Sequence, residues 1–191
     1  MSRILVALTI LCASAIYLVH TNRAVVAQEV QITELPAKLA QLHQKFPGCL
    51  RLDDPMMPPA GTVFRGRLGA TTQVYGILCE ASAYNWPFAV YLVRDGVFEE
   101  AERLYFADYS HEGGWTGTDL LFNASFDEKT GQLQGFSKAR GLGDCGSLIR
   151  LKWNPANEQF ALMEFRYKEE CDENVSIPFP LIYQRYEKKN N

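Results

Sequence analysis

The chain has 191 residues and a formal net charge of −3, with 19 Lys and Arg residues against 22 Asp and Glu residues. This length suits a single domain with a sizeable core. Because the chain has no long run of Lys or Arg, nucleic acid and anionic membrane surfaces are poor candidate partners.

The N-terminal segment has the pattern of a secretory signal peptide. A basic start is followed by an apolar run that is shorter than the ~20 residues of a membrane-spanning helix. The sequence Ala24-Val-Val-Ala27 fits a signal-peptidase site. We therefore expect residues 1–27 to be removed and residues 28–191 to form one exported β-rich domain without a membrane span. An uncleaved signal anchor is the alternative.

One helix is expected at the start of that domain. Thr33 is a suitable N-cap residue, and Pro47-Gly48 ends the helical pattern. The apolar face of this helix carries Leu35, Leu39, Leu42 and Phe46.

The rest of the domain is predicted to be mainly β-strand, because β-branched and aromatic residues recur between turn signals. The nearly continuous apolar run in Trp86–Arg94 indicates a central strand that is covered on both faces. The expected strands are 62–68, 73–80, 86–94, 97–106 (helix is the alternative here), 120–126, 132–138, 147–153, 159–166 and 179–184.

Two sequences predict hairpin turns between these strands. Asp95-Gly96 is typical of a two-residue turn, and the segment from Asp127 to Gly131 ends in a glycine that can take a positive φ. About eight strands at this spacing favour an antiparallel β-sandwich or barrel with one N-terminal helix, an α+β fold that is mainly β.

Four cysteines remain once Cys12 leaves with the expected signal peptide. An even number of cysteines in an exported domain indicates disulfides, and four cysteines allow three connectivities. The pairing of nearest neighbours joins Cys49 to Cys79 and Cys145 to Cys171. Each bond would close a loop of about 30 residues and stabilise the fold by roughly 3–4 kcal/mol.

Two motifs resemble a known family. The sequence Cys79-Glu-Ala-Ser-Ala-Tyr-Asn85 and the long stretch from Phe126 to Gly146 are similar to elements of the bacterial exported family called domain of unknown function 1176. Trp153 and Cys171 follow in the order that the family has. The resemblance covers most of the expected mature chain. It implies a location in the bacterial envelope and carries no established activity.

The candidate functional loop is Arg140-Gly-Leu-Gly-Asp-Cys-Gly146. In one interpretation it is a tight, disulfide-anchored loop in which Arg140 and Asp144 pair with each other or cap backbone groups. In the other, Arg140 binds an anion in a small polar cleft, with Tyr84 and Asn85 nearby.

Catalytic and metal chemistry find little support in the sequence. Cys145 lies in a turn that resembles the nucleophile loop of cysteine proteases, but only His43 and His111 could serve as its base, and oxidation would remove the thiol. No spacing of His and Cys residues indicates a metal site, and no cofactor motif is present.

The sequence therefore predicts a non-catalytic binding domain in the bacterial periplasm or outside the cell. Its partner would be an envelope protein or a small polar ligand. An envelope hydrolase and an enzyme-inhibitor module are the alternatives.

Overall fold

The structure, a computed structural model, describes residues 29–30, 35–49, 51–54, 63–80, 82–175 and 179–185. The expected signal peptide and the Thr33 cap lie outside these residues. Among the residues described, no helix has the length and apolar character needed to cross a bilayer.

The elements are ordered along the chain as follows: β1 (Glu29–Val30), α1 (Ala37–His43), β2 (Val63–Arg67), β3 (Thr72–Leu78), β4 (Pro87–Arg94), a 3₁₀ helix (Phe98–Glu100), β5 (Glu102–Arg103), β6 (Phe106–Ser110), β7 (Gly114–Thr118), β8 (Leu121–Phe122), β9 (Ser125–Asp127), β10 (Gln132–Lys138), β11 (Gly146–Asn154), β12 (Gln159–Lys168) and β13 (Leu181–Gln184). All strand pairs are antiparallel.

The first sheet has the strand order β1-β2-β3-β4-β5, and β8 also pairs with β4. Helix α1 covers one face of this sheet, where Leu39 packs with Tyr91 and Val93 of β4. The alternate β4 residues Val90 and Leu92 pack on the opposite side, toward the second sheet. Strand β4 is therefore apolar from Pro87 to Val93 because both of its faces are covered, as its sequence predicts.

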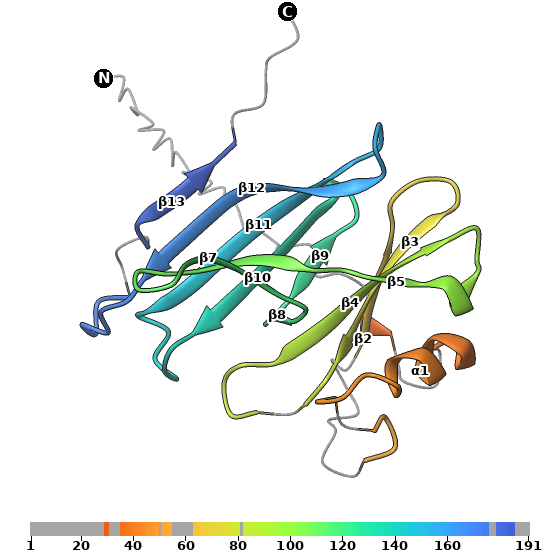
Figure 1. Cartoon of the computed structure of the whole chain (residues 1–191), viewed down its shortest axis with the longest axis horizontal. Helices are drawn as coiled ribbons and strands as arrows, with labels where there is room; N and C mark the ends of the chain where they lie inside the picture. The colour runs from red at the N-terminus through yellow and green to blue at the C-terminus, as the bar shows by residue number, and fades with distance from the viewer. Residues whose placement is uncertain are drawn as a thin grey trace, which may run out of the picture.

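The second sheet has the order β13-β12-β11-β10-β9 and packs its inner face against the first (Figure 1). Leu133, Ile149 and Phe165 contribute to the shared core. The two disulfides join Cys49 to Cys79 and Cys145 to Cys171. The expected fold class is confirmed: the domain is mainly β, antiparallel, with one short helix and both expected disulfides.

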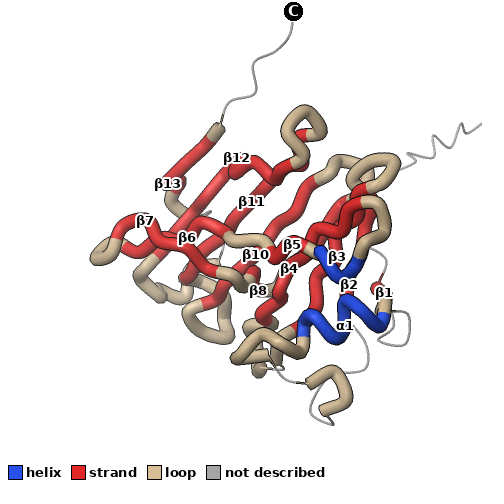
Figure 2. The backbone as a smooth tube through the Cα atoms, turned by 45° about the vertical axis from the view of Figure 1, so that its right-hand side comes forward, coloured by secondary structure: helices blue, strands red, loops and turns tan. Residues whose placement is uncertain are grey.

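A separate hairpin of β6 and β7 crosses the inner face of the second sheet, beyond the edge of the first (Figures 1 and 2). Two aromatic contacts hold it there. The ring of Trp115 lies 5.1 Å from that of Phe165, and the ring of Tyr109 lies 5.7 Å from that of Tyr167. Such edge-to-face contacts stabilise a packed arrangement beyond simple burial.

The expected strand at 97–106 is wrong for most of its length. Asp95 and Gly96 both have positive φ, as the turn prediction requires, but Phe98–Glu100 then forms a 3₁₀ turn. Only Glu102–Arg103 pairs with β4. The connection between β4 and β5 is therefore longer than two residues. The β6–β7 hairpin that follows is a further difference from the prediction, because a glycine-rich segment is typical of a loop.

The expected strand at 120–126 is interrupted at Asn123, which has a φ of 45°. The side chain of Asn123 accepts a hydrogen bond from the backbone N–H of Trp86 and donates one to the carbonyl of Phe136. These bonds tie the start of β4 to β10 and divide the segment into β8 and β9.

Candidate functional site

The predicted loop is closed by an ion pair between Arg140 and Asp144. Two guanidinium nitrogens donate to the two carboxylate oxygens at 2.9 and 2.6 Å, and the backbone N–H of Glu173 donates to the same carboxylate at 2.6 Å. The side chain of Asp144 is fully buried. The hydrogen bonds from Arg140 hold the pKa of the Asp144 carboxyl far below its usual value, so this group is ionised at neutral pH.

Tyr84 and Asn85 lie beside this loop. The Asn85 side chain donates to the carbonyl of Lys138 at 2.7 Å and accepts from the backbone N–H of Lys138 at 2.9 Å, so it acts like a strand partner at the end of β10. Tyr84 is 39% exposed, and its ring lies next to Gly141. The structure thus brings all four predicted site residues to one corner of the molecule, where most of their polar groups bind the protein itself.

The structure offers no support for a cysteine nucleophile at this loop. Cys145 is fully buried and bonded to Cys171. His43 ends helix α1 on the far side of the first sheet, and His111 lies at the tip of the β6–β7 hairpin near Glu169. A thiol nucleophile needs a neighbouring base, and Cys145 has neither a free thiol nor one of these histidines beside it.

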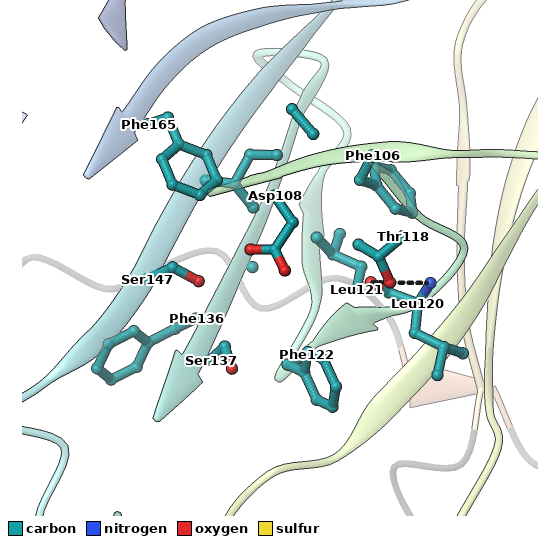
Figure 3. Close-up of a pocket in the computed structure, with 13 residues that line it drawn as sticks. Phe106, Asp108, Thr118, Leu120, Leu121, Phe122, Phe136, Ser137, Ser147 and Phe165 are labelled. Atoms are coloured by element: carbon teal, nitrogen blue, oxygen red, sulfur yellow. Dashed lines mark hydrogen bonds between the residues drawn. The ribbon is translucent and has the colours of Figure 1, made fainter. Parts of the chain in front are cut away.

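A small hollow lies between the β6–β7 hairpin and the inner face of the second sheet (Figure 3). Its volume is about 40 Å³, which is room for about two or three water-sized groups. Its walls are lined by four buried apolar side chains, those of Phe106, Leu121, Ile149 and Phe165.

Small residues on the second sheet create this space. Ser137 of β10 and Ser147 of β11 are directly opposite each other in the strand register, and Gly135 lies two residues before Ser137 on the same face. A Cβ at Gly135 would lie 2.5 Å from a methyl group of Leu121, so only glycine lets β8 approach this closely. The hairpin therefore spans a gap that no large side chain fills.

Asp108 of β6 supplies a carboxylate to this hollow, which we call the hairpin cavity. Asp108 is exposed, and one of its carboxylate oxygens accepts a hydrogen bond from the backbone N–H of Tyr109 at 2.9 Å. Figure 3 shows that carboxylate pointing between Phe165 and Leu121, with the hydroxyls of Ser137 and Ser147 beneath it. Thr118 also lines the cavity, but its hydroxyl is already bonded to the backbone of Leu120. One carboxylate and two hydroxyls thus converge on a space with phenyl walls.

A wider groove of about 420 Å³ lies on the outer face of the second sheet, next to Gly143 of the predicted loop. Its charged residues bind each other: Glu164 accepts from Arg150 at 2.9 Å and also from Arg166. Burial raises the pKa of Glu164, but the bonds from these two arginines outweigh it and lower the pKa. The charged side chains of this groove thus already bind each other, so the groove is a less suitable ligand site.

Sequence reasoning missed the residues of the hairpin cavity. Ser137 and Ser147 belong to strands that were predicted, but only the register shows that they are opposite each other. Asp108 lies in the glycine-rich region that resembles a loop, and no motif marks it.

The proteins to which this chain is similar are described as uncharacterized or of unknown function. The chain is 34% identical over 98 residues to a protein of Escherichia coli (strain K12) named Uncharacterized protein YpfG, a match that covers 50% of this chain and 27% of that protein's length. No solved structure matches the chain. A family model described as Protein of unknown function (DUF1176) matches residues 13–184. Because that match includes most of the sequence, the chain belongs to this family, as its motifs predict.

Proposed function

We propose that this protein is an exported, non-catalytic binding domain of the bacterial envelope. The signal-like sequence before Gln28 supports export. The two disulfides are compatible with an oxidising compartment, where such bonds persist.

The ligand that best fits the hairpin cavity is a primary ammonium group at the end of a small or extended molecule. A single observation carries this proposal: the Asp108 carboxylate and the hydroxyls of Ser137 and Ser147 converge on one hollow of about 40 Å³. An ammonium group has three N–H donors, and this set offers three acceptors. The volume admits an aminomethyl group and little more.

Other ligand classes fit less well. An anion would be repelled by the Asp108 carboxylate. A wholly apolar group would offer no hydrogen bond to that carboxylate or to the two hydroxyls, whereas an ammonium group would donate to all three. The phenyl walls suit the methylene that follows an ammonium, and a cation near aromatic rings gains further attraction.

The affinity of a minimal ligand can be bounded. With four non-hydrogen atoms, n-propylamine gains at most about 6 kcal/mol, which corresponds to a dissociation constant of tens of micromolar. A natural ligand would use the ammonium as an anchor and contact further surface outside the cavity.

Calorimetric titration of the mature protein with n-propylamine tests this proposal, with n-propanol as the uncharged control. We expect saturable binding of the amine, no binding of the alcohol and loss of amine binding in Asp108→Asn. The matched control is Glu112→Gln, which removes a carboxylate from the tip of the same hairpin and should keep the binding. Equal binding by wild type and Asp108→Asn would refute the proposal.

An enzyme-inhibitor module is the second candidate, and one observation favours it. Leu142 is 55% exposed at the tip of the loop that the Cys145–Cys171 disulfide anchors. A rigid loop that presents an apolar residue can enter an enzyme cleft at low entropic cost. Inhibition of an envelope protease that is lost in Leu142→Asp would support this candidate. A wild-type protein that inhibits none would count against it.

A further inference from the structure

His43 is a fully buried histidine, and the residues that the structure describes leave one of its ring nitrogens unpaired. The residue ends helix α1 and is 0% exposed. Its Nδ1 atom lies 3.0 Å from the hydroxyl of Tyr91, while Nε2 has no hydrogen-bond partner among the residues described. Buried polar atoms are nearly always paired, so a free ring nitrogen at such a place calls for an explanation.

The Cys49–Cys79 disulfide lies beside this histidine. An imidazole nitrogen of His43 and the two sulfur atoms are all within 4.8 Å of one another. Cys79 is fully buried at the end of β3, while Cys49 is only half-buried in the segment that follows α1. One nitrogen and two sulfurs therefore share a small, preformed space, and the sulfurs are bonded to each other.

We propose that reduction of the Cys49–Cys79 disulfide converts this cluster into a binding site for one Cu(I) ion. A dithiol reductant gives two electrons and two protons to the disulfide and becomes a disulfide itself. Both cysteines are then thiols. Cu(I) binds the two sulfurs and His43 Nε2, and the two thiol protons go to solvent. A disulfide oxidant that takes two electrons from the cysteines and two protons from solvent becomes a dithiol, re-forms the Cys49–Cys79 bond and releases the ion.

The number and type of donors favour Cu(I) over zinc. Thiolate sulfur is a soft ligand that suits Cu(I), and a structural zinc site needs a fourth ligand. Among the residues described, only these three offer His, Cys or carboxylate ligand atoms in this cluster. Tyr91 completes the arrangement, because a metal-bound histidine usually directs its other ring nitrogen to a hydrogen-bond partner.

One cation lies near the cluster, the guanidinium of Arg103, and it is already paired with Asp119 at 2.8 Å. Two thiolates and Cu(I) have a net charge of −1, which this guanidinium offsets in part. Arg103 is close enough to His43 to affect its ionisation, and its side chain is only 6% exposed. Its Nε and Nη1 atoms have no hydrogen-bond partner within the described part of the chain.

The test uses the Cys145→Ser/Cys171→Ser double variant, which keeps only the cysteine pair of interest. After anaerobic reduction, Cu(I) is titrated against a chromophoric chelator. We expect one Cu(I) per chain in the reduced form and none in the oxidised form. His43→Gln should weaken binding by about 10-fold or more, while His111→Gln, which replaces an exposed histidine, should not change it.

Three results would each overturn the proposal. They are an equal Cu(I) affinity in His43→Gln, no Cu(I) binding by the reduced protein, and binding that coincides with loss of the far-ultraviolet circular dichroism of the fold. X-ray absorption at the copper edge gives a second readout in the reduced protein of residues 28–191 with all four of its cysteines. It should show two sulfurs and one nitrogen around the ion, and loss of the nitrogen in His43→Gln. A shell of sulfur atoms alone in both proteins would contradict the site.

Discussion

The glycines of the Arg140–Gly146 loop should differ sharply in their tolerance of alanine. Gly146 has a φ of 129°, and a Cβ there would lie 2.0 Å from the carbonyl oxygen of Ser137. Gly143 has a φ of 73°, but its added Cβ would meet no atom closer than 3.5 Å. Gly141 needs no positive φ, and its added Cβ would make an ordinary contact with Tyr84 at 3.5 Å.

These differences set the expected free energies of unfolding. Gly146→Ala adds a positive-φ strain of about 1–2 kcal/mol to an overpacking cost of about 1–3 kcal/mol, so the loss is about 2–5 kcal/mol. Gly143→Ala carries the strain alone, about 1–2 kcal/mol. Gly141→Ala should stay within about 1 kcal/mol of wild type, or gain slightly from the stiffer unfolded chain.

Urea denaturation followed by tryptophan fluorescence measures this series. For a domain of this size each kcal/mol corresponds to about 2–4 °C in melting temperature, so Gly146→Ala should melt about 4–20 °C lower. The order Gly141→Ala, then Gly143→Ala, then Gly146→Ala is the essential result. A Gly146→Ala variant as stable as Gly141→Ala would refute the close approach of β10 and β11 at this point.

Three further predictions concern His43, the loop ion pair and processing. Burial, and then the charge of Arg103, lower the pKa of His43 from 6.5 to about 4, although the nearby backbone of Leu78 opposes this. Between pH 6.5 and 4 the unfolded chain therefore binds a proton that the folded, oxidised protein does not, and stability should fall by about 3 kcal/mol as the pH falls. His43→Gln should remove that slope in urea titrations; a slope that persists would disprove the assignment. Asp144→Asn and Arg140→Lys should both lower the melting temperature, because Asp144 is buried with three donors around it; unchanged melting with weaker capture of an envelope component would instead make this loop the functional site. Mass spectrometry should find a mature N-terminus at Gln28, and an intact residue 1–27 segment in the membrane fraction would show an anchor.

Local patterns in the sequence predict most of the second sheet. Strand β10 matches its expected bounds because the turn from Asp127 to Gly131 fixes where it begins. The disulfides follow from cysteine order and from the expected export. Strand β4 is recognisable because a strand with two covered faces is apolar at nearly every position, here from Pro87 to Val93.

The hairpin cavity could not be predicted in the same way. It depends on a hairpin, β6–β7, whose strands contain two glycines and one charged residue and lack a clear alternation. It also depends on a gap left by small residues, and the size of a gap is set by packing between elements far apart in the chain. The pairing of Arg140 with Asp144 was foreseeable from their spacing, but the burial of Asp144 against residues 171–173 was not.

The central claim is that the hairpin cavity holds an ammonium group beside Asp108. Isotope-filtered nuclear Overhauser spectroscopy with unlabelled n-propylamine and protein labelled on phenylalanine and serine tests it most directly. We predict contacts from the methylene next to the nitrogen to Phe106 and Phe165 and to the β protons of Ser137 and Ser147, all lost in Asp108→Asn. Contacts to other residues alone, or contacts that persist in Asp108→Asn, would contradict the account.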